Sequence, residues 1–336
     1  MAREIRSGRL VLRPGADPQA WDQLVTAHPD ATPFHLSTFL TTAGRLLGLD
    51  VHLTVAEVDG EVVGVVPLLV RSRGPFALVN HHLPFPYLGP LLRMDHPLEE
   101  LRDAVRRYLA PRTVLRASFE WRRPVTEVAG PHWLLETDYT SAFVPVAGLD
   151  DEALLARLAR DPRSRYRRAV REGVVAGPAA PEEVAGHLSR WNDEVFARQG
   201  LSPRWPAEAQ FELHQQLQPS GVSHATALRR DGELLGVEVS LLLNGQLIGW
   251  EMGVSEAGRR VNAGVVLQVH AMRNARDLGA KELDMLGAPT EGIAYYKRGL
   301  GAEFRRRGVA RWESPLVGGL RLAGRATALL PTRAAG

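Results

Sequence analysis

Lysine is rare in this sequence, and one of its two lysines has a chemically suggestive position. Of the 41 residues that are lysine or arginine, only Lys281 and Lys297 are lysine. A lysine kept among so many arginines indicates a place that needs a compact ammonium with three donors rather than a planar guanidinium. Lys297 follows Tyr295 and Tyr296 and lies shortly after a strand-like segment, Glu282–Gly287. The alternative is that a G+C-rich genome replaced most lysines and left this one by chance.

The composition excludes several kinds of chemistry. The chain contains no cysteine, which rules out disulfides, thiolate nucleophiles and zinc sites built from thiolates. With 336 residues, 45% of them apolar, it can bury a substantial core and is long enough for two domains. The charged N-terminus lacks an apolar signal segment, and the longest apolar run, Val62–Val70, is too short to cross a bilayer. These features predict a cytoplasmic protein without a membrane span.

A seven-residue pattern occurs twice and predicts the domain organisation. Asp59–Val65 reads DGEVVGV, and Asp231–Val237 reads DGELLGV. In each copy Asp-Gly supplies the positive φ angles of a tight turn, and the flanking apolar and β-branched residues fit strands. One such hairpin is common, but two similar copies in matching contexts predict a duplicated domain.

The segments around these hairpins predict the elements that must position Lys297. One helical pattern begins at Ser37, which is the expected N-cap. A later helical pattern, which includes Met272, ends at Gly279. The predicted helices are 37–48, 182–198, 207–217 and one ending at Gly279, and the predicted strands following the second hairpin are 246–254 and 282–287. We expect an α/β (α+β) chain with an N-terminal domain at 1–147, a C-terminal domain at 148–315 and a peripheral tail at 316–336.

Several of these motifs together resemble a known family. They are the segments Tyr295–Gly301 (YYKRGLG), Asp284–Gly287 (DMLG), Arg165–Val174 (RYRRAVREGV), Phe196–Leu201 (FARQGL) and Leu83–Pro90 (LPFPYLGP). With the hairpin, strand, helix and strand order, they resemble the Fem-type branch of the GNAT acyltransferase superfamily. The resemblance implies two tandem GNAT-like domains, each a mixed, mostly antiparallel sheet flanked by helices. It also implies transfer of an acyl or aminoacyl group to an amine.

The donor implied by the resemblance depends on one loop. Acetyl-CoA-dependent GNAT enzymes are similar in a glycine-rich loop whose backbone N–H groups cradle the pyrophosphate. Here the corresponding segment, Arg259–Val265 (RRVNAGV), lacks the glycine pair. The Fem branch lacks this cradle and takes its amino acid from aminoacyl-tRNA. Aminoacyl-tRNA is therefore the expected co-substrate, with no tightly bound cofactor, and acetyl-CoA or another acyl-CoA is the alternative.

The acceptor is implied less specifically. Cell-wall Fem enzymes pair a lysine of the first domain with an arginine to hold the diphosphate of the murein precursor, and Arg198 matches that arginine. The first half of this chain has no lysine, so Arg45 is the nearest substitute. Tyr87, in the loop similar to that of the family, and Arg204 with Trp205 complete the substrate-binding candidates.

The chemistry of such a transfer asks for few catalytic groups. An aminoacyl ester is already activated, so the enzyme has to place a neutral amine near the carbonyl and stabilise the oxyanion. Lys297 is the candidate for stabilising the oxyanion or the developing alkoxide, with Tyr296 as a hydrogen-bond donor. Glu251 or Asp284 is the candidate for accepting the amine proton, directly or through water. The structural alternative for each carboxylate is a solvated or arginine-paired side chain.

Two arginine clusters are candidates for binding the tRNA backbone, and DNA is not an expected partner. They are Arg163, Arg165, Arg167, Arg168 and Arg171, and then Arg305, Arg306 and Arg307. Tyr166 and Trp205 are candidates for stacking on a terminal base. The alternative for the first cluster is a solvated helix face. No metal is expected, because His81-His82 has no carboxylate at ligand spacing.

These observations predict an enzyme that forms an amide by moving an aminoacyl group from aminoacyl-tRNA to the amine of a small molecule or peptide. Two alternatives stay open at this point. One is an acyl-CoA-dependent N-acyltransferase, and the other is a catalytically idle GNAT-like pair that serves as a binding module. The sequence does not name the amino acid, the acceptor or the oligomeric state.

Overall fold

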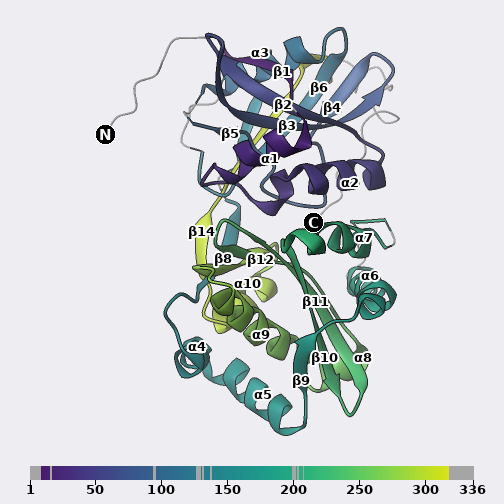
Figure 1. The fold of residues 1–336 in the computed structure, drawn as a ribbon, viewed down its shortest axis with the longest axis vertical. Helices are drawn as coiled ribbons and strands as arrows, with labels where there is room; N and C mark the ends of the chain where they lie inside the picture. Colours follow the sequence, from purple (N-terminus) through teal and green to yellow (C-terminus); the bar gives the residue numbers. More distant parts are fainter. Residues whose placement is uncertain are drawn as a thin grey trace. The chain divides into compact units, whose positions relative to one another are not determined.

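The computed structural model describes residues 9–15, 17–93, 96–125, 130, 132–136, 138–198, 202, 204–206 and 208–317, without the side chains of Phe196 and Arg198. These residues form two compact units (Figure 1). The first unit contains the described residues up to Tyr139 and those from Arg306 onward. The second unit is Thr140–Arg305.

The first unit is built on a mixed eight-stranded sheet. Its strand order is β1-β2-β3-β4-β6-β15-β7, with β5 paired to β3. Strands β4 and β6 are parallel, and helix α3 lies in the connection between them, as a parallel crossover requires. The strands are β1 Val11–Pro14, β2 Asp50–Val58, β3 Glu61–Arg73, β4 Phe76–Val79, β5 Leu91–Leu92, β6 Thr113–Trp121, β7 Trp133–Glu136 and β15 Gly308–Glu313.

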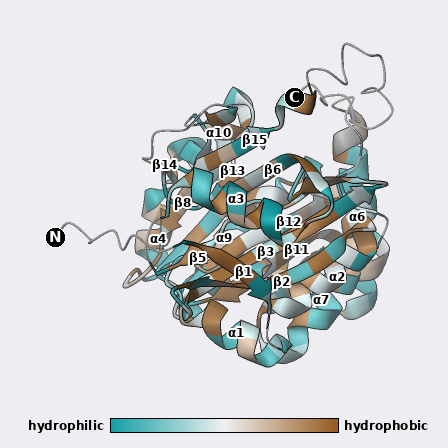
Figure 2. Ribbon diagram, turned by 90° about the horizontal axis from the view of Figure 1, so that it is seen from above, coloured by the Kyte–Doolittle hydropathy of each residue, from teal (hydrophilic) through white to brown (hydrophobic). Residues whose placement is uncertain are grey.

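The helices of the first unit are amphipathic and cover its sheet. In α3 the residues that repeat at helical spacing, Leu101, Ala104 and Val105, are buried in one cluster with Phe119 of β6. Figure 2 shows the corresponding mixture of hydrophobic and hydrophilic residues along helices such as α1 and α2. The helices are α1 Pro18–Thr26, η1 Pro33–His35, α2 Ser37–Leu47 and α3 Leu98–Tyr108.

Both predicted Asp-Gly hairpins are confirmed. In the first, Asp59 and Gly60 have φ angles of 53° and 83°, and β2 pairs with β3 in antiparallel register. In the second, Asp231 and Gly232 have φ angles of 52° and 81° between β10 and β11. The left-handed conformation is needed because it matches the turn to the twist of the flanking strands.

The second unit is built on a seven-stranded sheet with the order β14-β8-β13-β12-β11-β10-β9. Strands β12 and β13 are parallel, and helix α9 connects them. The strands are β8 Thr140–Pro145, β9 Val175–Pro178, β10 Ser223–Arg230, β11 Glu233–Leu243, β12 Gln246–Val254, β13 Glu282–Gly287 and β14 Glu303–Arg306. The predicted strands 246–254 and 282–287 are therefore confirmed.

Helix α9 organises the core of the second unit. Its buried residues Val265, Val266, Val269 and Met272 form one cluster with residues of β8, β10, β11 and β13. The helices are α4 Asp151–Arg157, α5 Arg160–Arg171, α6 Pro181–Arg198, α7 Ala209–Leu217, η2 Gln218–Ser220, α8 Glu256–Arg260, α9 Ala263–Asp277 and α10 Glu291–Gly299. None of the helices among the described residues is long and apolar enough to cross a membrane.

Two strands near the unit boundaries, β8 and β15, belong to other units than the predicted domain bounds assign to them. Strand β8 pairs with β13 of the second sheet, and β15 inserts between β6 and β7 of the first sheet. The structure thus divides the chain after Tyr139 and again after Arg305, whereas the sequence predicted contiguous domains at 1–147 and 148–315. Sequence periodicity identifies a strand but not the sheet that it joins. Most of the predicted tail, from residue 318, lies outside the described residues.

One predicted helix start differs in its capping. Ser37 is the first residue of α2 and not its N-cap, which is Leu36 without a side-chain hydrogen bond. The Ser37 hydroxyl and backbone N–H donate instead to Asp22, each over 2.7 Å. An acceptor from a neighbouring helix therefore satisfies the first turn of α2 in place of a local cap.

Candidate functional site

The ammonium of Lys297 is held by consecutive backbone carbonyls at the end of β13. Its Nζ donates to the carbonyl oxygens of Met285 and Gly287 over 2.6 Å each, and to that of Leu286 over 3.3 Å. The carbonyls converge because Leu286 adopts a left-handed conformation with a φ of 61°. A tetrahedral ammonium can serve such an arrangement, whereas a planar guanidinium cannot reach it in the same way.

Asp284 stabilises the same bend. It is fully buried, and its Oδ1 accepts a hydrogen bond from the N–H of Leu286 over 2.8 Å. Burial lowers the pKa of Lys297 to about 8, although the charge of Asp284 acts in the opposite direction. Two residues predicted as catalytic are thus adjacent, with Asp284 as a positioning residue for the lysine. At neutral pH the lysine is mainly charged.

This bend lies where the two parallel strands of the sheet separate. Only the first three residues of β12, Gln246–Ile248, pair with β13, at Glu282–Asp284. Strand β12 itself continues to Val254. The register of β12 against β11 also shifts after Gly249. A strand bulge at the point of separation re-aims side chains and ends pairing, which is a frequent feature of functional sites.

A buried acid that the sequence analysis missed lies near this point. Glu238, on β11, is 2% exposed, and its Oε1 accepts a hydrogen bond from Ser240 over 3.1 Å. The same oxygen is 3.4 Å from the position that a Cβ on Gly249 would occupy. Burial raises the pKa of Glu238 to about 8. The sequence does carry a signal for Glu238, because it is the only charged residue in the apolar run from Leu234 to Leu243.

Tyr296 is close enough to Glu238 for their charges to interact. Burial and the negative charge of Glu238 raise the pKa of the Tyr296 hydroxyl. Its ring packs against the core cluster around α9, and the hydroxyl is 3.9 Å from the position of a Cβ on Gly264. The phenol therefore stays protonated at physiological pH and can donate a hydrogen bond.

Glu251 belongs to a second group of polar residues, on the α6 side of the sheet. Its Oε2 accepts a hydrogen bond from Asn192 of α6 over 2.8 Å. Burial raises the pKa of Glu251 to about 7, while the side chain of Trp205, the charge of Arg204 and Asn192 act to lower it. Trp205 is 6% exposed and lies edge-on to Trp250 with 5.9 Å between the ring centroids. The structure thus brings Glu251, a predicted catalytic residue, together with Arg204 and Trp205, which were predicted to bind substrate.

The two groups lie on different faces of the sheet. Glu251 contacts α6, whereas the next residue, Met252, accepts a hydrogen bond from Gln268 of α9 over 3.4 Å. Alternation along a strand sends these two side chains in opposite directions. No contact in the described residues joins Glu251 to Lys297.

The arginine-rich helix α5 presents most of its cations to solvent. Arg167 and Arg171 are exposed on one face, while Arg165 pairs with Asp161 over 2.9 Å and Arg168 with Glu172 over 2.7 Å. Tyr166 does not have the stacking role considered for it. It is buried, and its hydroxyl accepts a hydrogen bond from Arg273 over 2.9 Å, because helical periodicity turns it toward α9. Trp205, the other stacking candidate, is buried against Trp250.

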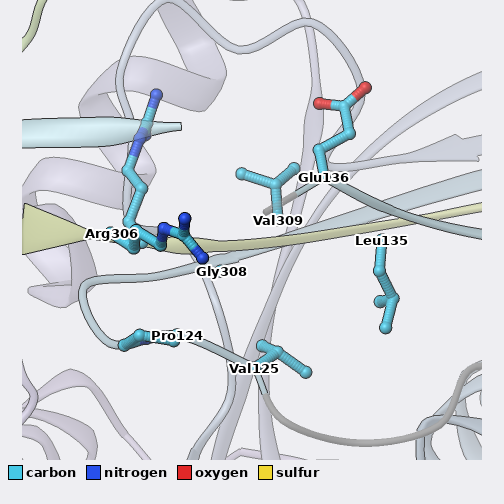
Figure 3. Close-up of a pocket in the computed structure, with 8 residues that line it drawn as sticks. Pro124, Val125, Leu135, Glu136, Arg306, Gly308 and Val309 are labelled. Carbon is cyan, nitrogen blue, oxygen red and sulfur yellow. The ribbon is translucent and has the colours of Figure 1, made fainter. Parts of the chain in front are cut away.

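The second arginine cluster is divided between the units. Arg305 belongs to the second unit and pairs with Glu282 over 2.7 Å. Arg306 and Arg307 belong to the first, where they line a cavity of about 210 Å³ with Glu136 and Val309 (Figure 3). Arg307 also pairs with Glu120 over 2.8 Å. The cavity contains none of the candidate catalytic residues.

The remaining predicted residues lie in the first unit or outside the description. Arg45 is exposed at the end of α2, and Tyr87 is 1% exposed in a left-handed conformation. The guanidinium groups of Arg122 and Arg307 lie over the Tyr87 ring at 6.0 and 5.7 Å. The side chain of Arg198 lies outside the described residues. Within the described ranges, no three histidine or acidic side chains are grouped as a metal site would require.

Comparisons with known proteins agree with this architecture. Residues 157–298 match the family model of the acetyltransferase (GNAT) domain. The crystal structure of FemX is similar with a TM-score of 0.71 and 16% identity, over 92% of this chain and 98% of that chain. L-PGS from Bacillus licheniformis has a TM-score of 0.54 and 16% identity over 96% and 99%. A tandem GNAT protein from the clavulanic acid biosynthesis pathway has a TM-score of 0.51 and 14% identity over 90% and 98%. No curated protein matches the chain.

The fold is therefore of the GNAT type, with two mixed sheets flanked by helices, and the second unit contains the segment that matches the GNAT domain. Within that class, the chain resembles the Fem-type branch. At 14–16% identity, the likeness to the solved structures establishes the fold. The family model matches only a segment of the second unit.

Proposed function

We propose that this chain is an aminoacyltransferase that moves an aminoacyl group from aminoacyl-tRNA to the amine of a small molecule or peptide. The observation that supports this most strongly is the ammonium of Lys297, held at the point where β12 and β13 separate. A fixed cation suits a reaction whose main demand is stabilisation of an oxyanion. The chain has no cysteine for a thioester intermediate.

In the proposed reaction, the neutral amine attacks the ester carbonyl carbon. The C–N bond forms, the bond from carbon to the ribose oxygen breaks, and one amine proton is transferred to that oxygen. Lys297 stabilises the negative oxygen by redirecting a proton from its longest contact, the 3.3 Å hydrogen bond to Leu286. Tyr296 donates a second hydrogen bond, and the amine proton passes to the ribose oxygen directly or through water.

The loop before α9 favours tRNA over CoA as the donor. A pyrophosphate cradle needs free backbone N–H groups at this position. Here the N–H groups of Val261 and Asn262 donate to the carbonyls of Gly258 and Arg259 within the turn of α8, over 3.2 Å each. The Arg260 side chain pairs with Glu256. These internal partners leave the two N–H groups unavailable to a phosphate.

The donor is tested by a transfer assay with charged tRNA, with and without ribonuclease. We expect ribonuclease to abolish transfer, and acetyl-CoA alone not to support it. If Arg167, Arg171 and one further arginine neutralise three phosphates, affinity for tRNA falls about 20–40-fold between 50 and 200 mM salt. Arg167→Gln/Arg171→Gln lowers the salt dependence, whereas Arg112→Gln, an exposed site in the first unit, leaves it unchanged. Salt-independent activity with acetyl-CoA would establish the acyl-CoA alternative, and no transfer with either donor would favour the binding module.

Glu251 lies on the other face of the sheet from Lys297, and the sequence prediction that it accepts the amine proton is tested through the pH profile. If it accepts the amine proton, kcat/KM of the wild type rises as the pH increases through about 7. Glu251→Gln lowers kcat/KM by about ten- to a hundredfold and removes this rise, because the amide cannot accept a proton. Glu256→Gln, at an exposed carboxylate, is the matched control. A profile of unchanged shape in Glu251→Gln would show that the acceptor amine itself sets the pH dependence.

A further inference from the structure

A cluster of basic side chains in the first unit is not used by the proposed reaction. Arg71 of β3 pairs in register with Leu78 of β4, and Leu78 pairs with Arg116 of β6. Directly paired residues point to the same face of a sheet, so the two arginines lie on one face with their Cα atoms about 10 Å apart. Ser118 lies two residues after Arg116 on β6 and therefore points to the same face. Arg311 of β15 pairs with Ser118, so it is on this face too. The opposite face carries the core cluster around α3.

Two histidines complete the cluster. His81 and His82 follow β4, and their rings are in contact in a tilted arrangement, with 3.9 Å between the centroids and 41° between the planes. The Nη1 of Arg116 is 3.1 Å from the Nε2 of His81. Arginine can only donate, so this Nε2 must be the unprotonated acceptor, and the proton of the neutral ring is on Nδ1. His81 therefore presents a second donor beside the arginines.

The cluster contains more cations than counter-charges. Glu313 pairs with Arg116 over 2.7 Å, and Glu136 pairs with Arg311. Arg71 is exposed and has no carboxylate partner among the described residues, and the Nε of Arg116 is buried without an acceptor there. Burial, His82 and the arginines 116, 311 and 71 lower the pKa of His81 to about 3. Desolvation of the partly buried ring, together with the positive charges around it, thus disfavours a proton on His81.

We propose that the first unit binds a doubly charged tetrahedral oxyanion, such as a phosphate group, between Arg71, His81 and Arg116. Arginine and histidine side chains on one face of the sheet offer the charge-assisted hydrogen bonds that such a dianion requires. The bound anion offsets the positive potential and accepts the Nη1 donor of Arg116 in place of His81, so the Nε2 of His81 is free to take up a proton and the ring becomes a third cation of the site. The site is on the first unit and does not depend on the transfer reaction.

Sulfate is the probe of choice, because its charge does not change between pH 5 and 8. We expect saturable sulfate binding at constant ionic strength, followed through the ring C–H resonance of His81, with affinity that increases as the pH falls from 7 to 5. The sign follows from proton uptake by His81. The other charged or titratable groups that face it are His82, Arg71, Arg116 and Arg311, with Glu313 and Glu136 paired to the arginines.

Arg71→Gln and His81→Gln each weaken sulfate binding about tenfold or more, the effect of losing one charge-assisted hydrogen bond. Arg112→Gln removes the same charge from an exposed position of the same unit and leaves binding unchanged. Arg71 is exposed, so its replacement does not endanger folding. Acetate, a planar monoanion, does not compete, while comparison of orthophosphate with phenyl phosphate shows whether a free or an esterified phosphate fits better. Equal sulfate binding by wild type and Arg71→Gln, or no shift of His81, would overturn the proposal.

Discussion

Replacing Lys297 by methionine is expected to lower kcat by about 10²–10³-fold with little change in KM, as for loss of one oxyanion donor. In the proposed reaction the ammonium meets negative charge that develops only in the transition state, so its removal is not expected to weaken ground-state binding. Lys297→Arg is expected to be poorly tolerated as well. A planar guanidinium cannot donate to the carbonyls of Met285, Leu286 and Gly287 in their observed arrangement.

Two controls separate catalysis from stability for Lys297. Lys281→Met removes the only other lysine, which is exposed, and should leave both kcat and thermal stability unchanged. Lys297→Met leaves buried carbonyls without a donor and therefore also destabilises the bend. Steady-state kinetics at a temperature where both variants are fully folded isolates the catalytic effect. A normal kcat in folded Lys297→Met would show that the lysine only stabilises the end of β13.

Replacing Glu238 by glutamine is expected to stabilise the protein at pH 8 by about 3–5 kcal/mol and to have little effect at pH 5. Burial raises the pKa of Glu238 from 4.5 to about 8, so the native state keeps a proton that the unfolded state releases. The free energy of unfolding of the wild type therefore falls as the pH rises from about 4.5 to about 8. Each unit of pKa difference corresponds to about 1.4 kcal/mol. A neutral amide removes this dependence.

Urea unfolding at pH 5 and pH 8 measures this effect. Glu233→Gln is the matched control, because Glu233 is an exposed carboxylate on the same strand. Other titrating groups contribute equally to wild type and variant, so they cancel in the difference between the two pH values. Parallel stability changes in wild type and Glu238→Gln would mean that the native carboxyl is already ionised at neutral pH. A buried acid that lowers the free energy of unfolding in this way is typical of functional sites.

Part of the candidate site could be predicted from sequence because its signals are local. Lys297, Tyr296 and Asp284 stood out through residue type and order along the chain. The structure places Asp284 and Lys297 around one bend and Tyr296 near Glu238. Glu251 was chosen from its strand, and it lies in a buried polar group. Glu238 was missed because its protonation depends on burial by α9 and its neighbours, which no local pattern records.

The sequence by itself determined the local geometry of this protein. Asp59-Gly60 and Asp231-Gly232 require left-handed turns, and the spacing of apolar residues from Val265 to Met272 requires a buried helix face, whatever the surroundings. These preferences act within a few residues and are therefore readable in one dimension.

Only the tertiary structure decided which distant groups meet and how they ionise. It joined β8 to the second sheet and β15 to the first, because strand pairing is selected by the edges available in space. It buried Tyr166, and it gathered Arg71, His81 and Arg116 from separate strands. Desolvation and the charges of neighbours set the pKa values of Glu238, Glu251 and Lys297, and both quantities exist only once the chain is folded.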